Sequence, residues 1–278
     1  MKLYCSLVMV LAGVTLARVE VTLPTDYQQL EWIGSATGAE YINTGYVIET
    51  GDAIETTFEL AAVQPTQWSS VFGCMLDKTS NPHFTFQPHY GSTTATKATY
   101  KYGGQMTTLA ADSFPVGVPV TFRCQNETAS WTSANGNGSI VLQNTVPVNC
   151  ISTLLIFNQN TATTVGASTP DASRIKMKLY SFTILAADGE TVRRNFVPCR
   201  RKSDGVVGLY ETVEGAFCSN RFGSGRFVGP DDIDLRYSYV QLTLSQYLDT
   251  GYTHKPDTTV ETVVYVPHPS SVPAKKYA

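Results

Sequence analysis

The stretch that decides the fold reads RIKMKLYSFTILAADGETVRRNFV and runs from Arg174 to Val197. Its first half places apolar side chains at alternate positions up to Leu179, and from Tyr180 onward at positions of the opposite parity. Alternation is typical of a β-strand, and a parity switch within one strand indicates either a β-bulge or burial on both faces. Asp188-Gly189 has the composition of a tight hairpin turn, because glycine adopts positive φ without strain. We therefore predict two long antiparallel strands, at 174–185 and 191–197.

Shorter runs of β-forming residues lie on both sides of this hairpin, at roughly ten-residue spacing and separated by Gly, Pro, Asn and Ser. Ser203-Asp204-Gly205 predicts a further turn. The remaining predicted strands are at 40–47, 53–62, 70–75, 83–89, 97–102, 118–125, 139–142, 154–157, 206–210 and from Gly215 onward. No convincing amphipathic helix separates them, so the pattern predicts an all-β sandwich of two antiparallel sheets.

The chain also contains a partial copy of itself. Tyr41 to Leu60 reads YINTGYVIETGDAIETTFEL, and Tyr247 to Val266 reads YLDTGYTHKPDTTVETVVYV, and the two align without a gap. A repeat of about 200 residues is too long for a solenoid unit and indicates a duplicated domain. We expect one complete domain at 18–230, a linker at 231–236, and the incomplete start of a second copy at 237–278. That last segment is expected to pair with a neighbouring sheet edge or to be protease-sensitive, since an isolated hairpin is marginal in water.

Composition and the first residues bear on partners and location. The charged fraction is 15% and the net charge is −3, which argues against nucleic acid as a partner. Met1 to Ala17 has one early lysine, an apolar run and small residues at its end, which is the pattern of a cleaved secretory signal. A buried first strand is the alternative. No later segment is apolar enough to span a membrane as a helix, so we expect a secreted or cell-surface protein.

Five cysteines follow the predicted signal, and none has the close spacing of a zinc site. Cys199 and Cys218 are the best candidates for a disulfide, because a short loop could close between them. The alternative is that all five are small buried hydrophobic residues. No cofactor is expected. Calcium could bind Asp and backbone carbonyl oxygens, but no D-x-D-x-D-G loop is present.

The carboxylates do not form a recognisable glycosidase pair. Glu55 and Glu59 share a strand face but lie about 13 Å apart along it, too far to flank one glycosidic bond. Asp232-Ile-Asp234 has a suitable spacing but falls in the predicted linker. We therefore expect a non-catalytic protein.

Aromatic residues in Ser-, Thr-, Gly- and Asn-rich surroundings suggest a binding site instead. An aromatic ring can stack on the C–H face of a sugar while amides and carboxylates bind its hydroxyls, in a shallow polar site. Core packing is the alternative for each ring, since aromatic residues dominate sandwich cores. The candidate carbohydrate-binding residues are Trp68, Trp131, Tyr90, Tyr100 and Tyr102.

Two groups of residues carry a resemblance to a known family. The opening group is Leu23-Pro24, Tyr27, Leu30-Glu31-Trp32-Ile33, Gly38 and Tyr41-Ile42-Asn43-Thr44-Gly45; the closing group is Tyr180-Ser181-Phe182, Asn195 to Arg200, Ser203-Asp204-Gly205, Gly208-Leu209-Tyr210 and Phe217. They resemble the concanavalin A-like, laminin-G-like domains of secreted bacterial and phage-associated repeat proteins, with Trp32 where tyrosine is usual. The resemblance is weak between residues 64 and 165, and it implies a two-sheet antiparallel jelly roll.

These observations together predict an exported, non-catalytic module that binds carbohydrate or a cell-surface protein. One alternative is a structural or adhesive repeat of a surface protein or phage appendage. A second is a glycoside hydrolase relative that lacks a recognisable carboxylate motif.

Overall fold

The structure, a computed structural model, describes residues 22–62, 69–75, 83–89, 97–109, 113–146, 150–171, 175–221, 223 and 225–230. The chain divides into two units, Met1–Asp234 and Leu235–Ala278, and every described residue belongs to the first. The predicted signal, the linker and the second copy lie outside the described residues. Within the described part of the chain, no helix has the length and apolar character needed to cross a membrane.

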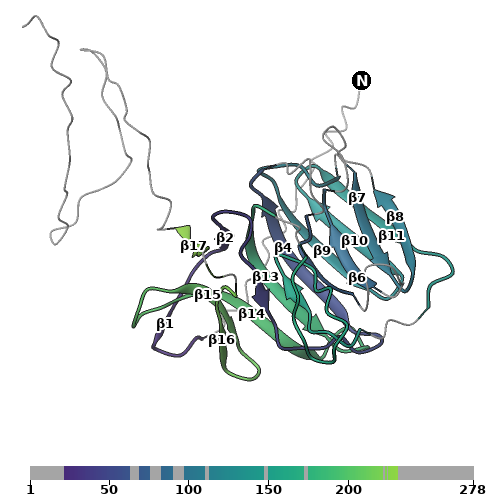
Figure 1. Cartoon of the computed structure of the whole chain (residues 1–278). Helices are drawn as coiled ribbons and strands as arrows, with labels where there is room; N and C mark the ends of the chain where they lie inside the picture. The colour runs from purple at the N-terminus through teal and green to yellow at the C-terminus, as the bar shows by residue number, and fades with distance from the viewer. Residues whose placement is uncertain are drawn as a thin grey trace, which may run out of the picture. The chain divides into compact units, whose positions relative to one another are not determined.

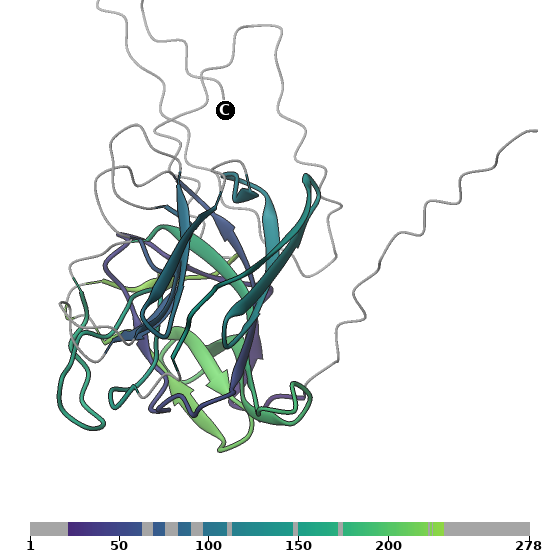
Figure 2. The same ribbon diagram turned by 90° about the vertical axis from the view of Figure 1, so that its right-hand side faces the viewer.

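The first unit is built from two antiparallel β-sheets (Figures 1 and 2), as the sequence predicts. The first sheet has the main strand order β11-β10-β9-β4-β13-β14-β15-β16. In that order, these strands are Gly136–Val141, Thr128–Ser133, Pro119–Gln125, Ala53–Leu60, Met177–Leu185, Val192–Arg201, Val207–Glu211 and Ala216–Cys218. Three short strands join it at one end: β1 (Tyr27–Gln29) pairs with β14, β2 (Ile33–Ser35) pairs with β13, and β17 (Phe227–Val228) pairs with β2.

The second sheet has six strands in the order β3-β12-β5-β6-β7-β8. Their bounds are Ile42–Asn43, Leu155–Ile156, Phe72–Met75, His83–Gln87, Ala98–Tyr102 and Gln105–Leu109. Along β6, Phe84 and Phe86 are fully buried in the hydrophobic core, while His83, Thr85 and Gln87 point to the other face because side chains alternate along a strand.

The core lies between the two sheets and is rich in phenylalanine. Phe86 of β6 stacks on Phe122 of β9 with ring centroids 3.9 Å apart, and Phe72 of β5 meets Phe182 of β13 edge-on at 5.7 Å. Each pair joins one sheet to the other, so the sheets face each other as a sandwich. Aromatic contacts of this kind add about 0.5–1.5 kcal/mol each beyond the area they bury.

The hairpin predicted at 174–197 is present, with its irregularity in the predicted place. Strand β13 pairs with β4, and their register shifts between Leu179 and Ser181, so Tyr180 is the extra residue of a bulge. The bulge explains the parity switch in the sequence. Gly189 and Gly205 have φ angles of 72° and 71°, so both predicted turns use the positive φ that glycine allows.

Cys199 and Cys218 are free thiols in the structure rather than the predicted disulfide. Cys199 of β14 pairs with Gly208 of β15, whereas Cys218 of β16 pairs with the adjacent residue Leu209. Because successive side chains of a strand point to opposite faces, this register sends the two thiols to opposite faces of the sheet. The described cysteines at 74, 124 and 150 are also free and buried.

Candidate ligand-binding face

Two of the five predicted carbohydrate-binding residues belong to the core. Tyr100 is fully buried and Tyr102 is 5% exposed, and both rings pack on Phe84. Their hydroxyls donate hydrogen bonds to the backbone carbonyl and the side-chain oxygen of Asn126, at 2.5 and 2.9 Å. The prediction is therefore wrong for these two residues, because the strand alternation of β7 turns both rings inward.

Trp131 is half-buried and lies over Gly138 of the neighbouring strand, with its ring centroid 5.4 Å from that of Phe114. It covers one end of the core rather than standing free as a stacking platform. Trp68 and Tyr90 lie outside the described residues. Of the predicted aromatic site, the structure therefore describes three rings, all packed on the core.

The two strand glutamates that the sequence excluded as a catalytic pair are held by cations. Glu55 forms a salt bridge of 3.0 Å with Arg123. Glu59 forms one of 2.9 Å with Lys178 and also accepts a hydrogen bond from the Tyr180 hydroxyl at 2.8 Å. Each carboxylate thus serves to bind a neighbouring strand on the outward face of the first sheet.

A polar layer lies on the face of the second sheet that points away from the first. Its members are His83, Thr85 and Gln87 of β6, and Thr99 and Lys101 of β7. Thr85 is directly opposite Lys101, and Gln87 is opposite Thr99, so these side chains form two rows across the sheet. All five are at least nine-tenths buried. A buried polar group without a hydrogen bond costs free energy, so partners are expected for each of them.

Hydrogen bonds connect part of the polar layer to two neighbouring segments. The Gln87 amide donates to the Ser70 hydroxyl at 3.2 Å, and Gln87 accepts from Thr99 at 3.2 Å. The side-chain oxygen of Gln159 lies 3.4 Å from the Gln87 amide, and the Gln159 amide donates to Asp171 at 2.5 Å.

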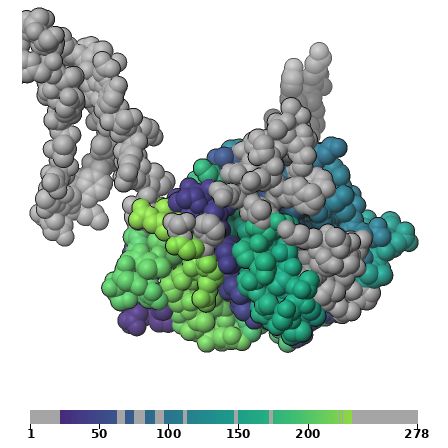
Figure 3. Space-filling view, in the orientation of Figure 1, coloured from purple at the N-terminus to yellow at the C-terminus, as the bar shows by residue number. Residues whose placement is uncertain are grey.

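The segment 157–171 can approach the sheet because Gly73 has no side chain. A Cβ atom at Gly73 would lie 2.3 Å from the Thr85 hydroxyl and 3.0 Å from the Gln159 Cβ. Asn160 holds the segment in place: its amide donates to the carbonyls of Thr153 and Ala167 at 2.7 and 2.8 Å. The outward side of the segment forms part of the molecular surface, drawn in teal-green in Figure 3.

Phe157 begins this segment in a strained backbone conformation. Its φ angle is 67°, which is rare for a bulky residue, and its ring is fully buried against Phe227 at 4.8 Å. Such strain costs about 1–3 kcal/mol and persists only where the surrounding structure holds it, which occurs often at functional sites.

His83 differs from the other members of the polar layer. Within the described residues, neither of its buried ring nitrogens has a hydrogen-bond partner, and the residue is 9% exposed. Burial, and then the positive charge of Lys101, lower the pKa of His83 to about 4, so the ring is neutral at pH 7. A neutral imidazole has one N–H donor and one acceptor nitrogen, and here both are available to a ligand.

Lys101 places a positive charge near this histidine, and the carboxylate of Asp171 lies near Lys101. Burial lowers the pKa of Lys101, and the nearby Asp171 carboxylate partly offsets that effect. Within the described residues, no group of three or more His, Cys, Asp or Glu is arranged to hold a metal ion. The layer therefore offers both donors and acceptors with balanced charge, which suits the hydroxyls of a polar organic ligand better than a metal.

The polar layer continues to an exposed edge of the sheet. Lys101 pairs with Met106 of β8, and Thr99 pairs with Thr108; Met106 is 48% exposed and Thr108 is also exposed. The strict alternation of HFTFQ at 83–87 indicates this face in the sequence, but alternation alone does not distinguish a solvated face from a buried polar one.

No family model, no curated protein and no solved structure matches this chain.

Proposed function

We propose that the first unit is an exported, non-catalytic jelly-roll module of the concanavalin A-like kind, and that it binds carbohydrate through the polar layer. The observation that carries the proposal is His83, whose two buried nitrogens have no hydrogen-bond partner among the residues that the structure describes. Buried polar groups are almost always hydrogen-bonded in proteins, so an exception invites a functional explanation. A sugar hydroxyl both donates and accepts, and can satisfy either nitrogen.

The composition of the layer also supports a carbohydrate. Imidazole, hydroxyl, amide and ammonium groups lie on this face of the sheet, and Gln159 and Asp171 of the neighbouring segment are joined by a hydrogen bond. Sites for small polar ligands fix orientation with a few such groups on a rigid scaffold. Strands β5, β6 and β7 supply that scaffold.

The test is retention of the full-length protein on a panel of immobilised polysaccharides, comparing wild type with His83→Leu. The substitution removes an unsatisfied polar group and keeps similar volume, so the thermal midpoint should be unchanged or higher. Retention should fall at least tenfold. Thr132→Val, on the outward face of the first sheet, is the matched control and should bind as wild type does.

Two results would refute the proposal. One is retention that His83→Leu and Thr132→Val leave equally intact. The other is the absence of retention on every polysaccharide, which would favour a structural or adhesive spacer.

A further inference from the structure

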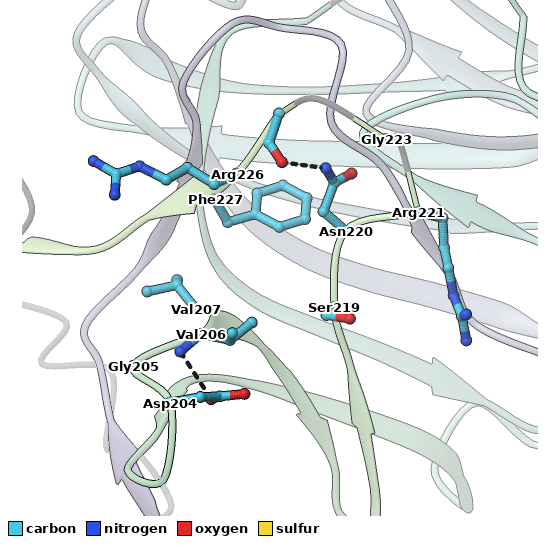
Figure 4. Close-up of a pocket in the computed structure, with 11 residues that line it drawn as sticks. Asp204, Gly205, Val206, Val207, Ser219, Asn220, Arg221, Gly223, Arg226 and Phe227 are labelled. Carbon is cyan, nitrogen blue, oxygen red and sulfur yellow. Dashed lines mark hydrogen bonds between the residues drawn. The ribbon is translucent and has the colours of Figure 1, made fainter.

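A second feature, separate from the polar layer, is a pocket of about 630 Å³ at the end of the first sheet (Figure 4). It lies between the turn that joins β14 to β15 and the segment that joins β16 to β17. Its volume falls within the range of about 300–1,000 Å³ that is typical of small-molecule sites. The lining residues are Asp204, Gly205, Val206, Val207, Ser219, Asn220, Arg221, Gly223, Gly225, Arg226 and Phe227.

Asn220 fixes the shape of this pocket. Its side-chain oxygen accepts a hydrogen bond from the backbone N–H of Tyr41 at 3.2 Å, and its amide donates to the carbonyl of Gly225 at 2.7 Å. Figure 4 shows the second bond directly. Arg221 is also anchored, because its backbone N–H donates to the carbonyl of Tyr41 at 3.1 Å. Asn220 and Arg221 are thereby tied to Tyr41, the residue that precedes β3 of the second sheet.

The glycines keep the pocket open. A Cβ atom at Gly205 or Gly223 would meet no atom within 4 Å, so both face free space. Val206, Val207 and Phe227 give the pocket an apolar part, and Phe227 is 3% exposed. The pocket thus combines an apolar floor with a polar rim.

Among the residues that the structure describes, two arginines on this rim form no salt bridge with a carboxylate. Elsewhere, Arg123, Arg193, Arg194 and Arg201 each form a salt bridge with a carboxylate. Within the described part of the chain, the side chains of Arg221 and Arg226 form neither a salt bridge nor a hydrogen bond. The acidic residue of the lining, Asp204, is already bound by Arg201 at 2.6 Å. Within the described residues, the rim of the pocket therefore carries two arginine side chains that form no salt bridge.

We propose that this pocket binds an oxyanion, a carboxylate, sulfate or phosphate group, through Arg221 and Arg226. The planar guanidinium offers paired N–H donors that match the oxygens of these groups. In Figure 4 the two side chains extend outward from different sides of the loop. Both are exposed, and exposed side chains change rotamer within nanoseconds, so they can turn toward a bound anion.

The proposal is tested by calorimetric titration of the full-length protein with sodium sulfate, glucuronic acid and glucose at low ionic strength. Glucose matches glucuronic acid without the carboxylate. Wild type should bind sulfate or glucuronic acid with a dissociation constant on the order of 1 mM, and the double variant R221Q/R226Q should bind at least tenfold more weakly. Added salt should weaken binding, because exposed charges are screened.

Arg193→Gln is the matched control: this arginine is also exposed, but it pairs with Glu49 and lies outside the pocket. It should leave binding unchanged. Binding of sulfate alone identifies a site for an inorganic ion, and binding of glucuronic acid but not glucose identifies an acidic sugar; both support the proposal. No anion binding, or binding that the double variant and the control affect equally, overturns it. Retention on polysaccharides through His83 should be the same in R221Q/R226Q and Arg193→Gln as in the wild type. A failure of the anion-binding proposal is therefore distinguishable from a failure of the carbohydrate-binding proposal.

Discussion

Glu40 should be among the most sensitive single positions for the stability of this unit. It is a fully buried carboxylate just before β3, and it ties together the loop 35–40. It accepts hydrogen bonds from the Ser35 hydroxyl at 2.5 Å, the Thr37 hydroxyl at 3.0 Å and the backbone N–H of Gly38 at 3.0 Å, and the Thr37 N–H lies within 3.2 Å. Gly225 leaves room for it, since a Cβ there would lie 2.4 Å from the carboxylate.

The expected cost of Glu40→Ala follows from these donors. The substitution removes the acceptor of the Ser35 hydroxyl, the Thr37 hydroxyl and the Thr37 N–H, whereas the Gly38 N–H keeps its hydrogen bond to the Ser35 oxygen at 2.7 Å. Each lost hydrogen bond costs about 1 kcal/mol where water replaces part of it. The free energy of unfolding should therefore fall by about 3 kcal/mol, or about 6–12 °C in thermal midpoint for a domain of this size. Glu40→Gln keeps the shape and one acceptor oxygen, and should cost about half as much.

The pH dependence gives an independent check. Burial opposes ionisation of Glu40, but the hydrogen bonds from Ser35 and Thr37 outweigh it, so the pKa lies below its ordinary value of 4.5. A carboxylate with a lowered pKa in the folded state stabilises above pH 4.5, and this contribution is lost as the pH falls through the folded-state pKa. Denaturant unfolding of wild type and Glu40→Ala should show a difference that is full at pH 7 and narrows below pH 4.5. Equal stabilities at pH 7, or a difference independent of pH, would refute the role of the ionised carboxylate.

Three further predictions concern other positions. Gly205→Val should lower the free energy of unfolding by about 1 kcal/mol or more, because a β-branched side chain is strained at a φ of 71° even though nothing lies within 4 Å of the new Cβ. Gly223→Ala is the control, since the φ of Gly223 is not positive. An unchanged thermal midpoint for Gly205→Val would contradict the prediction. Trp131→Ala should lower the free energy of unfolding by about 2–3 kcal/mol, which is less than for a fully buried tryptophan because the ring is only half-buried. Amide hydrogen exchange should then show β10 and β11 opening first. Loss of ligand binding without a change in exchange would instead place the ring in a binding site. The pKa of His83 is lowered from 6.5 to about 4 in the folded state, so the unfolded chain takes up the proton first as the pH falls. The free energy of unfolding of the wild type should therefore fall by up to about 3 kcal/mol between about pH 6.5 and about pH 4. His83→Leu should not show this fall, and parallel plots of unfolding free energy against pH for the two proteins would contradict the prediction.

Most of the strands could be predicted from the sequence, because alternation of apolar residues and turn residues are local properties of the chain. The runs at 53–62, 118–125 and 191–197 correspond to β4, β9 and β14, although β14 continues to Arg201. The bulge at Tyr180 was visible as a change of parity. In contrast, β10 reads TASWTS, and its serines and threonines resemble a loop; it is a strand because β9 and β11 pair with it on both sides.

The functional features were less accessible to sequence reasoning. Tyr100 and Tyr102 looked like surface residues because polar residues surround them, but their side chains alternate with Thr99 and Lys101, and parity decided which pair turned inward. The polar layer depends on Gly73, Gln159 and Asp171, which come together only through long-range packing. Nor could the sequence distinguish Arg221 and Arg226 from the other arginines, since the absence of an acidic partner is a property of the folded chain.

The pairing of β2 with β17 makes the unit mechanically asymmetric. Within the described residues, two residue pairs, Phe227 with Ser35 and Val228 with Gly34, hold β17 in the sheet. Tension on the chain after Val228 therefore acts on this short ladder before it reaches the long strands. The Val228–Gly34 pair breaks first, and the next pair to break releases Phe227, which lines the pocket of Arg221 and Arg226 and packs on the Phe157 ring. A modest load would thus release the pocket and the strained start of the 157–171 segment while the sandwich behind them stays folded.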